Sequence, residues 1–264
     1  MNTGSQNTLG TVLKIVAALA GLAGIGLALI ALAAPVGVWL GLWDFRQGFS
    51  MLRSAQPYVM WITIGCAVAT ALLLGLGKRA HLHNSGTLIK IAGAATIAAA
   101  IAWYIPNSYL PGSGAAIPPI HDISTDTVNP PAFVDVLPLR GTTSNPTVYG
   151  TGNAQMTPEV HAQRQREAYP DVVTQVFSEP ADQVFARALA AVNTLGWDLV
   201  AQVPAEGRIE ATDTTFWFRF KDDVVIRITE SPEGTLLDAR STSRVGVSDV
   251  GKNAARLRAF FAAL

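Results

Sequence analysis

The sequence contains almost no cysteine: Cys66 is the only one among 264 residues. It lies inside a long apolar run, so the charged C-terminal part of the chain has no thiol. A disulfide framework, a cysteine nucleophile and thiolate metal ligands are therefore excluded from that part. This composition fits a domain in an oxidising compartment, although it does not require one.

The sequence also lacks an excess of charge of either sign, because 19 lysines and arginines balance 19 aspartates and glutamates. No global field would draw such a chain to nucleic acid, and we expect no nucleic-acid partner. Charged residues make up only 14% of the chain and are concentrated after about residue 157, whereas half of all residues are apolar. This uneven distribution predicts an apolar part followed by a water-soluble part.

Long apolar runs without acidic residues fill the first part of the chain. A helix needs about 20 such residues to cross a bilayer, and three runs reach this length: residues 12–34, 57–76 and 87–105. Lys14 and Lys90 lie near the ends of the first and third runs, where they can extend to the lipid headgroups. We predict an all-α transmembrane region of three helices over residues 1–105, with the lipid bilayer as its partner.

The first run also allows a different interpretation. Ala31-Leu32-Ala33 has the small residues of a signal-peptide cleavage site. However, the apolar run is longer than the roughly 7–15 residues of a signal-peptide core. A membrane-spanning helix is therefore the favoured interpretation.

The loops between the runs differ in positive charge. The second loop contains Lys78, Arg79 and Lys90, whereas the first contains Arg46 and Arg53. Because positively charged loops stay on the cytoplasmic side, the second loop is expected inside the cell. The chain after residue 105 is then expected outside the cytoplasm.

Two histidines in the second loop, His81 and His83, are the only close histidine pair. Two imidazoles without a nearby carboxylate or thiol rarely hold a metal ion. We therefore expect no metal site there, and no sequence motif calls for a cofactor.

Proline is concentrated between the two parts, with ten of the fifteen prolines in residues 106–170. Proline fixes the backbone and removes a hydrogen-bond donor, so we predict an extended linker over residues 106–169, with a short helix after Thr157-Pro158. Ile120, Ile123 and Phe133 are too apolar for a flexible spacer. Part of the linker is therefore expected to dock on the soluble domain.

The remaining residues, 170–264, alternate in the manner of a small α+β domain. Helices are expected over residues 180–195 and after Ser248, and strands over 171–177, 197–203, 209–220, 224–230 and 236–245. The short separators predict an antiparallel meander of four to five strands with the two helices on one face. A shift of apolar parity in the long strand indicates a bulge near residues 212–215.

Several blocks of the sequence carry a family resemblance. They are IHDISTDTVNPPAF, AYPD, GRIEATDTTFWFRFKDDVVIRI and SRVGVSDVGKNAARLRAF. Over residues 120–264 the chain resembles the bacterial family named domain of unknown function 1499, some members of which have a multi-pass membrane region before the domain. The resemblance implies no activity. Because the family is bacterial and the loop charges place the chain after residue 105 outside the cytoplasm, we expect a bacterial inner-membrane protein with a periplasmic C-terminal domain. Its recurrent residues fall on His121, Asp122, Arg244, Gly246, Ser248, Asp249, Gly251 and Asn253, whereas Val247 departs from the polar or basic residue expected there.

The segment before the last helix is one candidate site. Helix N-termini present unpaired N–H groups, and Arg244 beside Ser248, Asp249 and Asn253 could complete a site for an anion or a carboxylate. The alternative is that Ser248 and Asp249 only cap the helix, while Arg244 pairs with an acid such as Asp122.

The outer face of the sheet is a second candidate. Strand alternation would make five side chains project together: Trp217, Arg219, Arg227, Arg240 and Arg244. Arginines beside an aromatic ring suit carboxylates, phosphates or lipid headgroups. The alternative is that Asp238 and Glu210 neutralise the arginines across the strands, with the linker packed over Trp217.

His121 and Asp122 permit a hydrolase hypothesis. The histidine would act as base, the aspartate would orient it, and a serine at 241, 243 or 248 would be the nucleophile. The GxSxG pattern of a nucleophile elbow is absent from the sequence. The alternative is that both residues fasten the linker to the domain.

These features predict a membrane-anchored, extracytoplasmic binding or scaffolding module. Its partner would be an anionic ligand, a lipid headgroup or another membrane protein. The rival hypothesis is an enzyme of unrecognised, hydrolase-like type that uses His121 and a serine.

Overall fold

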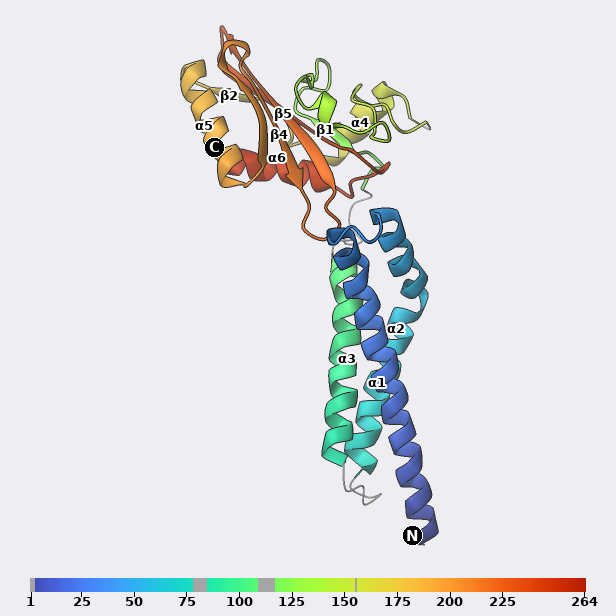
Figure 1. Cartoon of the computed structure of the whole chain (residues 1–264). Helices are drawn as coiled ribbons and strands as arrows, with labels where there is room; N and C mark the ends of the chain where they lie inside the picture. The colour runs from blue at the N-terminus through green and yellow to red at the C-terminus, as the bar shows by residue number, and fades with distance from the viewer. Residues whose placement is uncertain (1–2, 78–84, 109–116, 155) are drawn as a thin grey trace. The chain divides into compact units, whose positions relative to one another are not determined.

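The computed structural model describes residues 3–77, 85–108, 117–154 and 156–264 (Figure 1). The chain divides into two compact units, residues 1–110 and 111–264. The loop positions Lys78, Arg79, His81 and His83 lie outside the described residues.

The first unit consists of three long helices, as predicted from the apolar runs. They are α1 (Thr3–Trp39), α2 (Phe45–Leu76) and α3 (Ser85–Ser108). Each is long and apolar enough to cross a membrane. The helix α2 begins earlier than its apolar run because Asp44 and Gln47 form a reciprocal capping box: Asp44 accepts from the Gln47 N–H at 2.9 Å, and Gln47 accepts from the Asp44 N–H at 3.1 Å.

Small side chains let the three helices approach closely. Ala17 and Ala92 are fully buried in one cluster, and a Cβ atom at Gly24 would lie 2.6 Å from the Ala95 carbonyl oxygen. Thr70 and Thr96 join α2 to α3 through a hydroxyl–hydroxyl hydrogen bond of 3.1 Å. Packing of small residues and interhelical polar contacts are the usual means of helix association in lipid.

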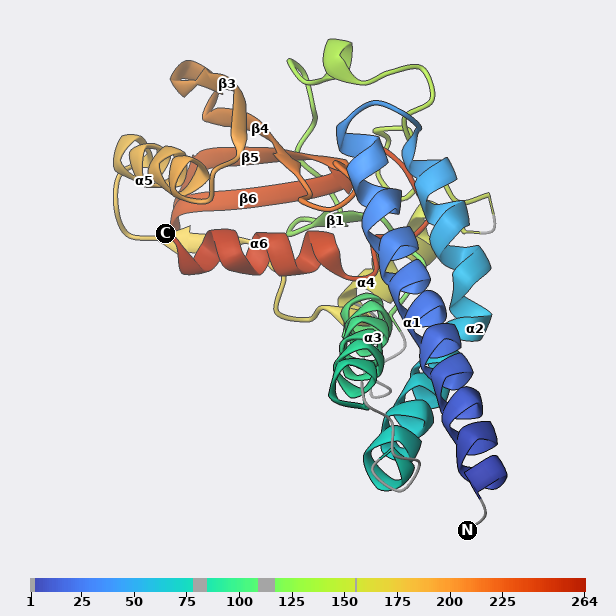
Figure 2. The same ribbon diagram turned by 60° about the horizontal axis from the view of Figure 1, so that its bottom comes forward.

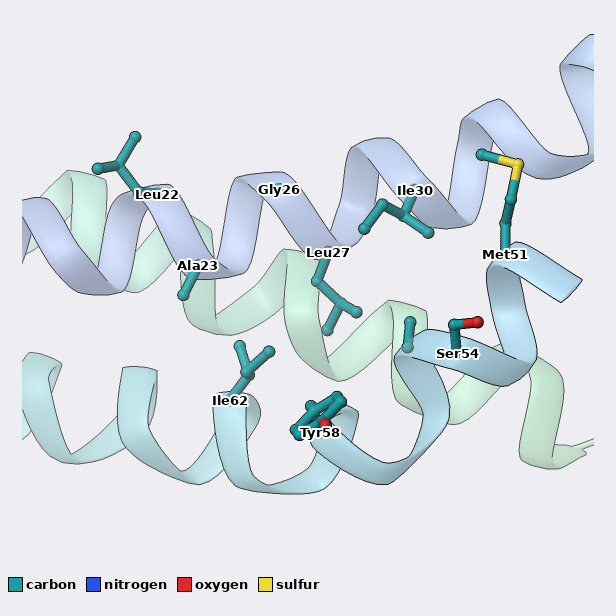
Figure 3. A pocket seen from close by; sticks show the side chains of 10 residues that line it. Leu22, Ala23, Gly26, Leu27, Ile30, Met51, Ser54, Tyr58 and Ile62 are labelled. Carbon is teal, nitrogen blue, oxygen red and sulfur yellow. The ribbon is translucent and has the colours of Figure 1, made fainter.

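An open groove of about 410 Å³ runs between α1 and α2 (Figure 3). Its lining is almost entirely apolar, with the Ser54 and Tyr58 hydroxyls as exceptions. Such a surface is ordinary for helices that face lipid chains, and it brings no group suited to chemistry.

The second unit contains an antiparallel sheet with helices, which confirms the α+β class. The sheet has six strands: β1 (Asp122–Ser124), β2 (Gln175–Phe177), β3 (Asp198–Val203), β4 (Arg208–Thr214), β5 (Lys221–Ser231) and β6 (Gly234–Ser243). Their order is β1-β6-β5-β4-β3, and β2 also pairs with β6. The count exceeds the four to five expected because β1 comes from the segment that we interpreted as linker.

The helices α5 (Ala181–Thr194) and α6 (Lys252–Ala262) bury their apolar stripes in one core with the sheet (Figure 2). Alternate residues of β5, Val224, Ile226 and Ile228, supply its centre. The rings of Trp197 and Phe260 stack at 5.8 Å between centroids. The period-two pattern of β5 thus separates this core from the sheet's other face.

The strand expected over residues 209–220 is shorter than predicted. It ends at Thr214, and residues 215–220 form a loop in which the Thr215 N–H donates to the Phe220 carbonyl at 2.8 Å. Trp217 and Arg219 therefore do not lie on the outer sheet face. The shift of apolar parity, which we had interpreted as a bulge near residues 212–215, instead marks the end of the strand. The register irregularity lies in β3, between Leu199 and Ala201.

The expected linker is largely part of the folded unit. Residues 117–154 hold β1 and a short 3-10 helix, η1 (Leu137–Leu139), and α4 (Pro158–Ala168) follows them. Thr157 caps α4 by accepting from the Val160 N–H, as its Thr-Pro signature predicted. A second 3-10 turn, η2 (Pro204–Glu206), joins β3 to β4. The compact unit begins at residue 111, not at 170.

Candidate functional site

The outer face of the sheet is built around a buried ion pair between β1 and β6. Arg240 Nε donates to Asp122 Oδ1 at 2.9 Å, and Arg240 Nη2 donates to Asp122 Oδ2 at 2.7 Å. The two side chains are 4% and 1% exposed. Arg240 also donates to the Pro131 and Thr147 carbonyls, and it lies over the Phe133 ring. Arg240 is thus covered by residues 131–147 and is not an exposed binding group.

Arg227 pairs across the strands, as the neutralisation hypothesis predicted. Its Nη2 donates to Asp238 Oδ2 at 2.7 Å and to Asp126 Oδ2 at 3.0 Å. Asp238 also accepts from the hydroxyls of Thr125 and Thr174. The Arg227 guanidinium therefore has two carboxylate partners.

Glu210 binds the backbone of residues 134–136 and does not neutralise the outer-face arginines as expected. Its side chain is fully buried and accepts the backbone N–H groups of residues 134–136, while Arg208 neutralises it. These bonds hold residues 131–147, which we call the covering segment, so that Phe133 and Val136 pack on Val225. The segment thus covers Val225 of β5; the expectation that it would pack over Trp217 is wrong.

Arg244 pairs with Asp223 and not with Asp122. Its Nη2 donates to Asp223 Oδ1 at 2.8 Å, its Nε to Oδ2 at 3.0 Å, and its Nη1 to the Leu139 carbonyl at 2.7 Å. Arg140 binds the same carboxylate from the covering segment. Two arginines therefore share one fully buried aspartate.

Asp249 occupies the N-terminus of α6. Its carboxylate accepts the N–H of Gly251 at 2.7 Å and that of Asn253 at 2.8 Å. Burial raises the pKa of Asp249 to about 6, against the opposing effect of these two bonds. A carboxylate of the chain itself therefore occupies the N-terminus of α6, where the anion hypothesis placed an external anion. The Ser248 hydroxyl accepts from the Val250 N–H.

Asn253 is fully buried and ties together the elements around it. Its side-chain amide donates to the His121 carbonyl and to the Ser243 hydroxyl, and its oxygen accepts from Ser241 and Arg256. Arg256 in turn binds Asp213 and Asp222. The partners of Asn253 are therefore His121, directly before β1, two serines of β6 and one arginine of α6.

His121 is buried with both ring nitrogens lacking a hydrogen-bond partner in the described part of the chain. Burial lowers the pKa of the imidazole, and the charge of Asp122 opposes this shift. Gly152 lies against the ring, and a Cβ atom there would be 2.8 Å from His121 Cε1. Within the described residues, neither a serine hydroxyl nor the Asp122 carboxylate is hydrogen-bonded to the His121 ring.

A cleft of about 430 Å³ opens beside Arg244. Its lining combines apolar side chains with charged ones: Leu139, Asp198, Leu199, Val200, Thr212, Lys221 and Arg244. Sequence reasoning found Arg244 but missed Lys221, which lay in the separator expected between the strands 209–220 and 224–230, and Leu139, which lay in the expected linker. No local residue pattern links these positions, because they come from β3, β4, β5 and the residue after β6, and Leu139 comes from the covering segment.

Among the described residues, no group of three or more histidines, cysteines, aspartates or glutamates is placed to hold a metal ion. The buried carboxylates of this unit described above instead pair with arginines and backbone groups.

These features define a membrane-associated protein with an α+β domain whose polar residues mostly bind one another. The family model described as protein of unknown function (DUF1499) matches residues 122–264, and the chain belongs to this family. The match begins at β1, so the family domain includes the covering segment. A search of curated proteins finds none that matches the chain.

We predict that Asp122→Ala destabilises the protein by about 3–5 kcal/mol, because it leaves the Arg240 charge buried without a partner. Asp171→Ala is the matched control. Asp171 binds Arg258 through the same two-bond geometry, at 2.6 Å each, but the pair is about half exposed. Its loss should cost no more than about 1 kcal/mol. Chemical denaturation measures both, and equal losses would contradict the structural role of the buried pair.

We also predict that His121 makes stability fall in acid. The unfolded imidazole takes up a proton below its ordinary pKa of 6.5, whereas the folded one stays neutral to lower pH. Unfolding therefore becomes easier as pH falls below about 6.5. Asp249 acts oppositely: its raised pKa of about 6 stabilises the fold below that pH, and this contribution is lost as pH rises through 6.

The measurement compares wild type with His121→Gln between pH 7 and pH 5. The free energy of unfolding of the wild type should fall more steeply, by up to about 1.4 kcal/mol per pH unit. Asp249 is present in both proteins, and so is His161, a second histidine whose pKa is lowered by burial. Their contributions to the pH dependence of stability therefore cancel in the comparison. Parallel curves would show that His121 does not carry this dependence.

Proposed function

We propose that this protein is a multi-pass protein of a bacterial inner membrane whose periplasmic domain binds an anionic ligand. The observation that carries the proposal is the cleft beside Arg244. It is an open concavity on the domain in which charged and apolar side chains meet.

The charges around the cleft favour an anion. Arg140, Arg244 and Lys221 are three cations, and Asp223 and Asp198 are two carboxylates. One positive charge is therefore in excess. Lys221 is exposed, so its ammonium group is accessible to a ligand. Asp223 and the Leu139 carbonyl hold Arg244 in place, so its guanidinium has a fixed position at the cleft.

The apolar part of the cleft favours a ligand with an apolar body. Leu139 is 55% exposed and Leu199 is 40% exposed, and Val200 lies beside them. Burying such surface stabilises a complex in proportion to its area. A carboxylate or phosphate joined to an apolar body, as in an anionic lipid, matches both parts of the cleft.

Binding is favoured over catalysis by the use of the polar residues. Asp122, Asn253 and Asp249 each have partners inside the fold, and neither ring nitrogen of His121 is hydrogen-bonded to a serine hydroxyl within the described residues. The hydrolase alternative would need an activated serine. No arrangement in the described domain favours it.

The binding test uses the full chain in nanodiscs of zwitterionic lipid. The probe is dihexanoylphosphatidylglycerol, and dihexanoylphosphatidylcholine is the neutral comparison. Lys221→Gln should weaken binding of the anionic probe by about two- to fivefold, the usual effect of losing one partly exposed ion pair. Lys252→Gln, which changes an exposed lysine outside the cleft lining, should leave it unchanged. Equal binding of both lipids, or equal effects of both variants, would contradict the proposal.

The periplasmic location rests on the positive loop between α2 and α3, and it can be tested by labelling intact cells. In a Cys66→Ser background, a cysteine at Val128, which is 91% exposed, should react with an impermeant maleimide. A cysteine at residue 83 should react only after the cells are permeabilised. The reverse pattern would place the domain in the cytoplasm.

A further inference from the structure

The turn between β6 and α6 exposes two valines. We call residues 246–251, with the sequence GVSDVG, the valine turn. Val247 is 58% exposed and Val250 is 44% exposed. The charged residue of the turn is Asp249, whose carboxylate already accepts two backbone N–H groups at the N-terminus of α6. The side chains that the turn presents to its surroundings are therefore mainly apolar.

The valine turn holds Val250 in an unfavourable backbone conformation. Its φ is 55°, in the left-handed region that a β-branched residue rarely adopts. The Val250 N–H donates to the Ser248 hydroxyl at 3.3 Å, and the Asp249 N–H donates to the Ile120 carbonyl at 3.0 Å. Glycine or asparagine would adopt this backbone with less strain. A valine there costs stability although its side chain is exposed, and such strained residues are concentrated at functional positions.

The valine turn lies beside the place where the chain enters the domain. A Cβ atom at Gly251 would lie 3.4 Å from Ile117 Cδ1. Ile117 is the first described residue after α3, which ends at Ser108. A chain of nine residues spans at most about 30 Å. The length of the chain thus confines the valine turn to the neighbourhood of the bilayer that the apolar helices fit.

The opposite end of β6 provides a comparison within the same domain. The strand runs for ten residues, so its two ends lie about 30 Å apart. Val176 of β2 pairs with Leu236 near the first end and is 57% exposed. The valine turn follows the second end. Val176 and Val247 are thus equally exposed valines at opposite ends of one strand, and only Val247 belongs to the turn beside Ile117.

We infer that the valine turn contacts the interfacial layer of this same bilayer, with the side chains of Val247 and Val250 among the upper parts of the acyl chains. Burial of apolar surface supplies the attraction, so the contact requires no anionic lipid. The linker makes the contact intramolecular, with an effective concentration on the order of millimolar, so that even a small apolar contact becomes populated. The contact goes beyond the proposed ligand cleft and shares no residue with it.

The test uses the full chain in phosphatidylcholine liposomes. In the Cys66→Ser background, Val247→Cys carries an environment-sensitive fluorophore, and Val176→Cys is the matched control. Lipids with a nitroxide high on the acyl chain report contact by quenching. The label at 247 should emit at shorter wavelength than the label at 176 and should be quenched several-fold more strongly. Equal emission and quenching at both positions would overturn the inference. A short-wavelength emission without quenching would show that protein covers the turn, and this too would overturn it.

A second variant, Val250→Asn, separates the contact from the fold. Asparagine adopts the left-handed backbone more readily than valine, so this variant should be at least as stable to chemical denaturation. It removes one of the two apolar side chains, so quenching of the label at 247 should fall at least twofold. Unchanged quenching would overturn the part of Val250 in the contact. Quenching that disappears at high salt would contradict an apolar contact. None of these results bears on binding in the cleft.

Discussion

The buried pair of Asp122 and Arg240 is the interaction on which the architecture of the domain depends. It joins residues 118 positions apart and fixes β1, after which the covering segment follows, on its neighbour β6. A charge removed from water is tolerated only when its partners surround it. The aromatic ring of Phe133 and two backbone carbonyls complete that surround for Arg240. The covering segment consequently buries much of the outer face of the sheet, although the residues of this face are charged and polar like those of a protein surface.

The same internal use of charge extends to the residues that carry the family resemblance. His121, Asp122, Asp249 and Asn253 stand in the blocks that carry the family resemblance. The structure gives the last three partners within the fold. A polar network that is fully satisfied specifies one arrangement of a core. The proposed ligand surface is the cleft beside Arg244, whose lining includes Lys221 and Leu199.

Local patterns predicted the elements but not their partners. The alternation of Val224, Ile226 and Ile228 gave β5 and its buried face, and Thr157-Pro158 gave the start of α4, because both signals act over a few residues. Residues 215–220 were wrongly predicted to continue the strand, because FWFRF alternates as a strand does. Hydrogen bonds to Thr215 end the strand instead. The choice of Asp223 over Asp122 by Arg244 could not be predicted, since it depends on how the covering segment folds. For the same reason Leu139 could not be assigned to the cleft. Lys221 was missed because it was placed in a turn, whereas it is the first residue of β5.

One edge of β6 pairs along its length with β5, and the other edge is divided between β1 and β2. The segment between those two short strands, residues 125–174, therefore begins and ends on the same strand. Its ends are fixed independently of what lies between them. The entropy of closing such a loop grows slowly, by about 0.6 kcal/mol for each doubling of length. Insertions and deletions within it can thus reshape the wall of the cleft during evolution while the sheet keeps its register.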